Sequence, residues 1–260
     1  DKRDIPYAGA NMYIKDKVYV NLGTEYSSGA NSMNSDTYTI EDNVSIFAGN
    51  HNITLGTHNE IYRFNNLFLQ YAYGGYTFNS LADFFADKCS QFNYRYADPE
   101  VEGVNGPRWA ATTIAAQFGL YAQDEWKPTR DFTLTYGLRM DIPVLLNNPT
   151  ANEGFNATEI SANSGEKVGV VPKATPLFSP RIGFRWWMDK EHKALLRGGA
   201  GLFTGRVPFV WLSNAYNNTG VEAKSIQYNN PPAKFPQTSN PYEEVVKTGA
   251  AAAGGKATIN

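Results

Sequence analysis

Two consecutive stretches of the sequence alternate apolar and polar side chains over about ten positions each, joined by the turn-like residues 127–131. In the first stretch the apolar positions are Ile114, Ala116, Phe118, Leu120 and Ala122. In the second they are Phe132, Leu134, Tyr136, Leu138, Met140 and Ile142. A period of two is the signature of β-strands with one apolar and one polar face, so residues 113–142 are predicted to form a β-hairpin.

Two further hairpins are predicted from the same alternation. One spans about residues 181–204, with a charged turn at 189–193, and a less regular one spans about residues 37–64, with a turn at 49–52. In the less regular hairpin, Asp42 shares a face with Tyr38, Ile40, Val44 and Ile46. An acidic residue among apolar ones predicts a β-bulge or a different register at that point.

The connections between hairpins are long and polar, whereas the turns within them are short. The long segments are 65–111, 143–180 and 205–260, and the last of these is low in pattern and expected to be mobile. Within the first, "SLADFFAD" at 80–87 predicts one short helix with Ser80 as its N-cap. The stretch "KVYVNLGTE" at 17–25 is a possible seventh strand of the same sheet.

Long two-faced strands, short turns at one end and long loops at the other are typical of a transmembrane β-barrel. The predicted fold class is therefore all-β, with antiparallel barrel strands, long extracellular loops and one loop helix. The apolar face would meet lipid, and Trp126, Trp186 and Trp187 would form an aromatic girdle beside the turns. The polar face would line a wet lumen with Arg185 and with the permeation-path or plug-contact candidates Arg139, Asp141, Arg181 and Arg197.

A soluble all-β binding or adhesion module, such as a glycan-binding one, is the alternative, because the same alternation can separate a protein core from water. The strand length, beyond the usual five or six residues, and the long-short loop rhythm favour the barrel.

Composition narrows the choice of partners. Aromatic residues make up 14% of the chain, which favours strands, and the formal net charge of -2 gives no general field for nucleic acid. Cys89 is the only cysteine, and no run approaches eighteen apolar residues. The sequence also opens without an apolar signal core, so we expect either a soluble protein or a piece of a longer exported chain.

Enzymatic chemistry is not predicted. His58 and Glu60 share a strand face but lack a third metal ligand, so neither a metal site nor a cofactor is expected. An enzyme on a β-scaffold would require His58 or His192 to converge with carboxylates on one pocket. Aromatic side chains in the long segments could instead contact a sugar or peptide, with Tyr73, Tyr76, Trp109 and Trp211 as candidates.

The chain resembles a TonB-dependent outer-membrane transporter, most closely the Oar-like branch of Bacteroidetes. The matching stretches, about two thirds of the chain, are "HNITLGTHNEIYRFNNLFLQYAYGGYTFNSLADFF" at 51–85, "GLYAQDEWKPTRDFTLTYGLRMDIP" at 119–143, "FSPRIGFRW" at 178–186 and "LLRGGAGLFTGRVPFVWLSNAYNNTG" at 195–220. None of these is a catalytic motif.

The resemblance implies a protein of the bacterial outer membrane, surrounded by outer-membrane lipid. Such transporters form a barrel of about 22 strands closed by a plug, through which the TonB complex acts. The ligand class would be a siderophore, a glycan or a peptide. This sequence matches a middle portion of the barrel without a recognisable plug, so we expect a partial barrel segment.

Overall fold

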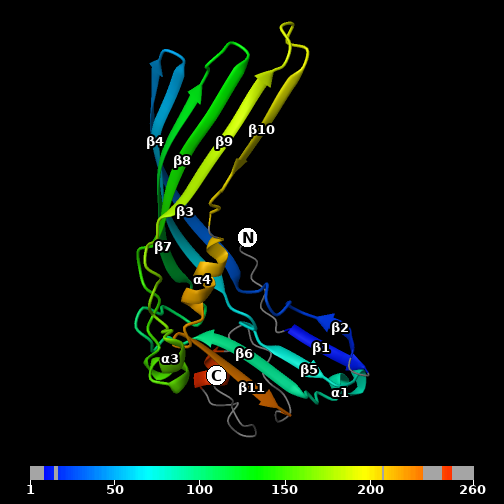
Figure 1. The fold of residues 1–260 in the computed structure, drawn as a ribbon. Coiled ribbons are helices and arrows are strands. Elements are labelled where there is room, and N and C mark those ends of the chain that lie inside the picture. Colours follow the sequence, from blue (N-terminus) through cyan, green and yellow to red (C-terminus); the bar gives the residue numbers. More distant parts are fainter. Residues whose placement is uncertain (1–8, 15–16, 207, 231–241, 248–260) are drawn as a thin grey trace.

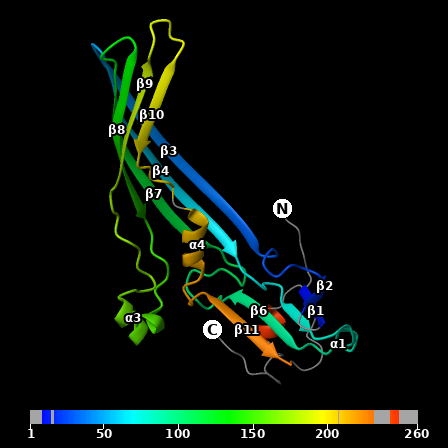
Figure 2. The ribbon, with the colours of Figure 1, turned by 45° about the vertical axis from the view of Figure 1, so that its right-hand side comes forward.

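The computed structural model describes residues 9–14, 17–206, 208–230 and 242–247. Six long strands form one antiparallel sheet, the large sheet, in the order β10-β9-β8-β7-β4-β3 (Figures 1 and 2). Their bounds are β3 (Asn31–Ala48), β4 (His51–Phe68), β7 (Ala111–Trp126), β8 (Phe132–Leu145), β9 (Leu177–Trp187) and β10 (Leu195–Gly201). Among the described residues this sheet does not close on itself, because β3 and β10 each pair on one side only.

Short turns join the strands at one end of the large sheet, and long segments join them at the other (Figure 1). Ala48 pairs with His51 across a two-residue turn, in which Gly49 has a φ of 61°. Asn50, the second central residue, is not among the residues with positive φ, so the turn is of type II′, whose twist suits the strands it joins. In the β9–β10 turn the Asp189 carboxylate accepts hydrogen bonds from the amides of Glu191 and Lys193 at 2.9 and 3.0 Å.

The pairing of β3 with β4 is uninterrupted from Asn31 opposite Phe68 to Ala48 opposite His51. The expected bulge or register change at Asp42 is therefore wrong. Asp42 stays on the face of Ile40 and Val44, directly opposite Thr57. The polar pair Asp42 and Thr57 can lie on the apolar face because β3 is an edge strand, where the Asp42 side chain remains exposed.

The register keeps the two faces in phase across all six strands. The apolar face carries, for example, Val44, Leu55, Ala122 and Leu138 in one row, because each is paired with the next. Its side chains are exposed, as Val44 and Leu120 at 56% illustrate. A contiguous apolar surface of this extent is not left in contact with water in soluble monomers, so it is a surface for lipid or a partner.

A second, smaller sheet lies at the end of the long segments (Figure 1). Its order is β11 (Ala223–Asn229), β6 (Gln91–Ala97), β5 (Gly75–Phe78), β1 (Gly9–Ile14) and β2 (Lys17–Leu22), with β1 and β5 parallel. Phe92, Tyr94, Ile226, Tyr228 and Val245 form its core. The segments expected as loops thus build a folded layer, and the possible seventh strand at 17–25 belongs to this layer rather than to the large sheet.

The predicted helix is present as α1 (Leu81–Phe85), and Ser80 Oγ accepts a hydrogen bond from the Asp83 amide at 3.0 Å. Three further helices were not predicted, namely α2 (Glu153–Asn156), α3 (Glu159–Ser164) and α4 (Phe209–Asn217), nor was the π-helical segment Tyr242–Lys247. Within the described part of the chain, no helix has the length and apolar character needed to cross a membrane. The expectation of mobility for residues 231–241 and 248–260 lies outside the described residues.

Candidate functional site

Arg139 and Asp141 form an ion pair in the middle of the polar face. Arg139 Nε and Nη2 donate to the two oxygens of Asp141, each at 2.8 Å. Gln117 Nε2 donates to Asp141 Oδ1 at 3.0 Å, and Asp141 is only 1% exposed. A two-pronged guanidinium–carboxylate contact is both strong and geometrically specific, so this pair is a fixed element of the polar face.

Gly119 makes room for this pair. It lies opposite Asp141 on the neighbouring strand, and a Cβ added to it would stand 2.6 Å from Arg139 Nη2 and 2.9 Å from the His58 carbonyl oxygen. Glycine is thus required here by the close approach of a side chain and a backbone carbonyl rather than by its backbone angles.

A second charged cluster on the same face contains Glu60, Tyr62, His58 and Glu41. Glu60 accepts hydrogen bonds from the Tyr62 hydroxyl and from Arg206 Nη2. His58 Nδ1 lies 3.1 Å from Glu41 Oε2, and His58 Nε2 lies 3.6 Å from Glu60 Oε1. In the part of the chain that the structure describes, no group of three or more His, Cys, Asp or Glu residues is arranged to hold a metal ion.

Arg206 shows how the chain runs after β10. It follows the strand at one edge of the large sheet, yet it binds Glu60 on β4, near the opposite edge. The chain after β10 therefore crosses the polar face from one side to the other. Sequence reasoning missed this contact, because its partners are 146 residues apart and Arg206 stands in an irregular stretch without strand or helix periodicity.

Helix α4 continues this crossing and is fixed to the same face. Asn66 Nδ2 donates to Ser213 Oγ at 2.9 Å, Asn217 Nδ2 donates to the Asn66 carbonyl at 2.8 Å, and the Ala111 amide donates to Asn217 Oδ1 at 3.0 Å. Asn66, Ser213 and Asn217 are buried. A satisfied network of buried polar groups sets one position for α4 against β4 and β7.

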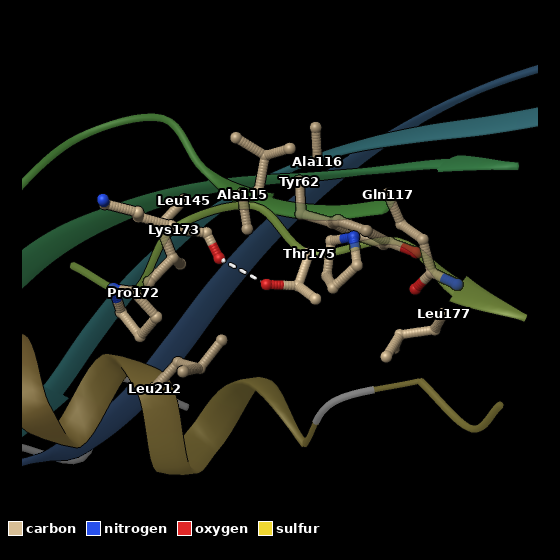
Figure 3. Close-up of a pocket in the computed structure, with 12 residues that line it drawn as sticks. Tyr62, Ala115, Ala116, Gln117, Leu145, Pro172, Lys173, Thr175, Leu177 and Leu212 are labelled. Atoms are coloured by element: carbon tan, nitrogen blue, oxygen red, sulfur yellow. Dashed lines mark hydrogen bonds between the residues drawn. The ribbon is translucent and has the colours of Figure 1, made fainter. Parts of the chain in front are cut away.

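A cavity of about 230 Å³ lies between α4 and strands β4, β7 and β8. Leu212 extends from α4 toward the strands, where Tyr62, Ala115 and Leu145 form much of the wall (Figure 3). The segment Pro172–Thr175, with Lys173, completes the lining. Part of the polar face near the long segments is thus covered by an inward-folded helix over an apolar cavity.

The other two arginine candidates lie on the same face as the Arg139–Asp141 pair: Arg197 is nearer the short turns, and Arg181 is opposite Gly137, one row from Arg139, which pairs with Ser179. Arg197 pairs across the strands with Arg185, and Arg181 lies on the same face four residues before Arg185. Neither Arg181 nor Arg197 has an ion pair among the described residues. The four predicted residues share one face, but the structure joins only Arg139 with Asp141.

The four aromatic candidates lie in different surroundings. The Tyr76 ring packs against Phe92 at 4.8 Å in the small sheet, and the Tyr73 ring lies 5.1 Å from the Arg108 guanidinium. Trp109, in the segment that connects β6 to β7, is partly buried, whereas Trp211 on α4 is 75% exposed. Tyr73 and Tyr76 serve packing, so Trp211 is the candidate with a free ring face.

The tryptophans near the short turns divide between the two faces. Trp126 and Trp186 lie on the apolar face, and Trp126 stacks on His51 at 5.7 Å. Trp187 lies on the polar face, where the Arg185 guanidinium is 5.4 Å from its ring and His192 stacks at 4.9 Å. The expectation that Trp187 belongs to the lipid-facing girdle is therefore wrong, because successive strand residues point to opposite faces.

Cys89 lies in the segment between α1 and β6. Its thiol donates to the Gln91 carbonyl at 2.8 Å, and burial raises the pKa of the thiol above its ordinary value. A raised pKa keeps the sulfur protonated at neutral pH, which suits packing rather than nucleophilic chemistry.

Comparison with known proteins gives one finding. The family model described as "Outer membrane beta barrel domain" matches residues 6–260, nearly the whole chain. No curated protein and no solved structure matches. The chain belongs to the outer membrane beta barrel domain family, and its protein resides in the bacterial outer membrane. The apolar face accordingly meets lipid, and the polar face lines the inside.

Proposed function

We propose that the protein is a TonB-dependent transporter that captures a ligand outside the cell and passes it into the periplasm without covalent chemistry. The observation that carries this proposal is the inward-folded segment from Arg206 to Asn217, which is bound to the polar face by Glu60, Asn66 and the Ala111 amide. A lumen partly covered by its own chain suits controlled passage of a ligand better than free diffusion.

The charged groups of the polar face also support this proposal. Arg139 and Asp141, together with Gln117, offer strong hydrogen-bonding groups inside a membrane wall, where such groups commonly mark a ligand pathway. The dependence on TonB rests on the resemblance of "GLYAQDEWKPTRDFTLTYGLRMDIP" and "LLRGGAGLFTGRVPFVWLSNAYNNTG" to TonB-dependent transporters. In such transporters the TonB complex acts through a plug domain.

The ligand-capture surface is assigned to the folded layer at the long-segment end. In outer-membrane barrels the longer loops face the outside, and the small sheet with α1 and β11 lies at that end (Figure 2). The exposed ring of Trp211 on α4 is the aromatic contact that we assign to a siderophore, glycan or peptide ligand.

The test uses the whole protein in its native bacterium. Compounds removed from the growth medium are compared between wild-type cells and cells lacking the gene. A compound taken up only by the wild type, with uptake stopped by a protonophore and by loss of TonB, is the expected result. Uptake that persists in the presence of the protonophore would identify a passive pore instead and overturn the proposal.

A further inference from the structure

Three neighbouring rows of residues near the short turns create a depression on the polar face. The first row is Thr133, Arg185 and Arg197, on β8, β9 and β10, directly opposite one another. The second is Thr135, Gly183 and Gly199, and the third is Gly137, Arg181 and Gly201. Two glycines of the middle row thus lie between Arg185 and Arg197 in the first row and Arg181 in the third; we call this set of residues the arginine basin.

The basin is open. A volume of about 500 Å³ is lined by residues of the first two rows, including Thr133, Thr135, Gly183, Arg185 and Arg197, while Arg181 and the third row lie outside this lining. A Cβ added to Gly183 would meet nothing nearer than the Gly198 carbonyl oxygen, at 3.6 Å. The space above Gly183 is therefore not filled by another side chain of the described residues.

The charges of the basin are not balanced by the described residues. Arg185 and Arg197 oppose each other across two strands, an arrangement that destabilises a sheet when the like charges have no counterion. The carboxylate that lines the basin, Glu125, is 2.6 Å from Lys127 Nζ, which is a third cation of the lining. Arg139, on the same face, has its carboxylate in Asp141; Arg181, Arg185 and Arg197 have none among the described ion pairs.

We infer that the arginine basin binds an oxyanion, namely a phosphate or carboxylate group of a small ligand. Guanidinium groups present paired N–H donors that match the oxygens of such anions, and the Thr133 hydroxyl in the same row adds another donor. The glycines of the middle row let the anion approach the strands closely, as glycines do where a ligand meets backbone.

The position of the basin relates it to transport. Short turns face the periplasm in outer-membrane barrels, so the basin lies at the periplasmic end of the lumen wall (Figure 1). Assigning the bound anion to the transported ligand rests on the proposed function; the binding of an oxyanion does not. If so, the transported ligand carries an anionic group, and the basin is the last part of the lumen wall that it contacts before it reaches the periplasm.

Binding is tested on the purified whole protein in neutral detergent, by equilibrium titration with inorganic phosphate. We expect saturable binding that citrate competes away and that methylglucoside, which is neutral, leaves unchanged. The double variant Arg185→Gln with Arg197→Gln is expected to bind phosphate at least tenfold more weakly. Arg130→Gln, which removes an exposed cation of the β7–β8 turn, is the matched control and should bind as the wild type does.

A second variant separates shape from charge and from folding. Gly183→Val fills the basin but keeps every cation. The branched valine side chain suits a strand, so this variant should fold normally. It should nevertheless lose phosphate binding, because the space for the anion is filled. Absence of saturable binding in the wild type, or equal binding by Arg185→Gln/Arg197→Gln, would overturn the inference. Because the titration needs neither TonB nor energy, failed transport with intact binding would refute only the proposed function.

Discussion

At the scale of single residues, glycines decide where the charged groups of the polar face can lie. Gly119 lies beneath the Arg139–Asp141 pair, and Gly56 lies beneath the ring of Tyr121, whose Cζ would be 2.4 Å from an added Cβ. A glycine under a large cross-strand neighbour is a recurrent device of curved sheets. Glycines therefore occur in these strands where a neighbouring residue needs the space of a missing side chain, although glycine by itself weakens a strand.

Gly119→Ala is predicted to destabilise the barrel wall by about 1–3 kcal/mol, because the new methyl group overlaps Arg139 Nη2 and the His58 carbonyl oxygen. The measurement is the unfolding free energy of the whole protein in urea and lipid vesicles. Gly106→Ala is the matched control, since nothing lies within 4 Å of a Cβ at that position. Equal stability of the two variants would show that the pair does not depend on the space above Gly119.

Asp189 makes the β9–β10 turn sensitive to acid. The hydrogen bond from the Lys193 amide, followed by those from Ala194 and Glu191, holds the pKa of the Asp189 carboxyl below its usual value. A lowered pKa in the folded state adds stability above the unfolded value of about 3.9, and this stability is lost as the pH falls through the folded value. We therefore predict faster amide exchange at Lys193 and Ala194 below about pH 4, after correction for intrinsic rates.

The control for this prediction is Asp189→Asn. An amide oxygen still accepts a hydrogen bond but does not titrate, so the exchange of Lys193 should no longer change over the same pH range. A variant that keeps the acid response would place its origin in another group.

At the scale of elements, alternation along the sequence predicts the strands of the large sheet but not the folded layer. Strands β7 and β8 carry ten or more alternating residues and β9 carries nine, and their register follows from keeping apolar side chains on one face. The N-terminal part of β3, "NSMNSD", lacks apolar alternation and was therefore not predicted as a strand. As a result, β3 and its partner β4 are longer than predicted. Strands β6 and β11 pair across more than a hundred residues, and no local pattern specifies that pairing.

In the candidate site, too, some features could be predicted from the sequence and others could not. Arg139 and Asp141 are two residues apart on one strand, so their common face follows from periodicity alone. The position of α4 could not be predicted, because it depends on Asn66, Ser213 and Asn217, polar residues whose partners lie far away in sequence. Loop segments that fold back onto a wall carry no periodic signal.

Arg206→Ala is predicted to loosen α4 from the polar face. Glu60 would lose its cation while remaining 7% exposed, but Arg206 itself is more than half exposed, so the loss is about 1 kcal/mol. Amide exchange of residues 211–217 should become roughly fivefold faster, and Arg130→Ala should leave it unchanged. Unaltered exchange in Arg206→Ala would mean that the asparagine network alone holds the helix.

At the scale of the whole molecule, one sheet separates two environments, and a folded layer lies at the end with the long segments. The apolar face presents Phe118, Leu134 and Leu196 on three strands, while Gln117, Thr135 and Arg197 are their immediate neighbours on the polar face. The Arg139–Asp141 pair, the cluster around Glu60, the arginine basin and α4 belong to the polar side, whereas the His51–Asp124 ion pair lies on the apolar side beside the short turns. The account of function depends on this division, because the inside of a barrel can hold charges that the lipid side cannot.

The most direct test of this division is spin labelling of the whole protein in lipid bilayers. Labels at Phe118, Leu134 and Leu196 are compared with labels at Gln117, Thr135 and Arg197, one position at a time, for collision with oxygen, which concentrates in lipid. The account predicts that the first three labels are accessible to oxygen and that the second three are not. The opposite pattern, or protection of both sets, would make the apolar face a protein core and contradict the barrel wall described here.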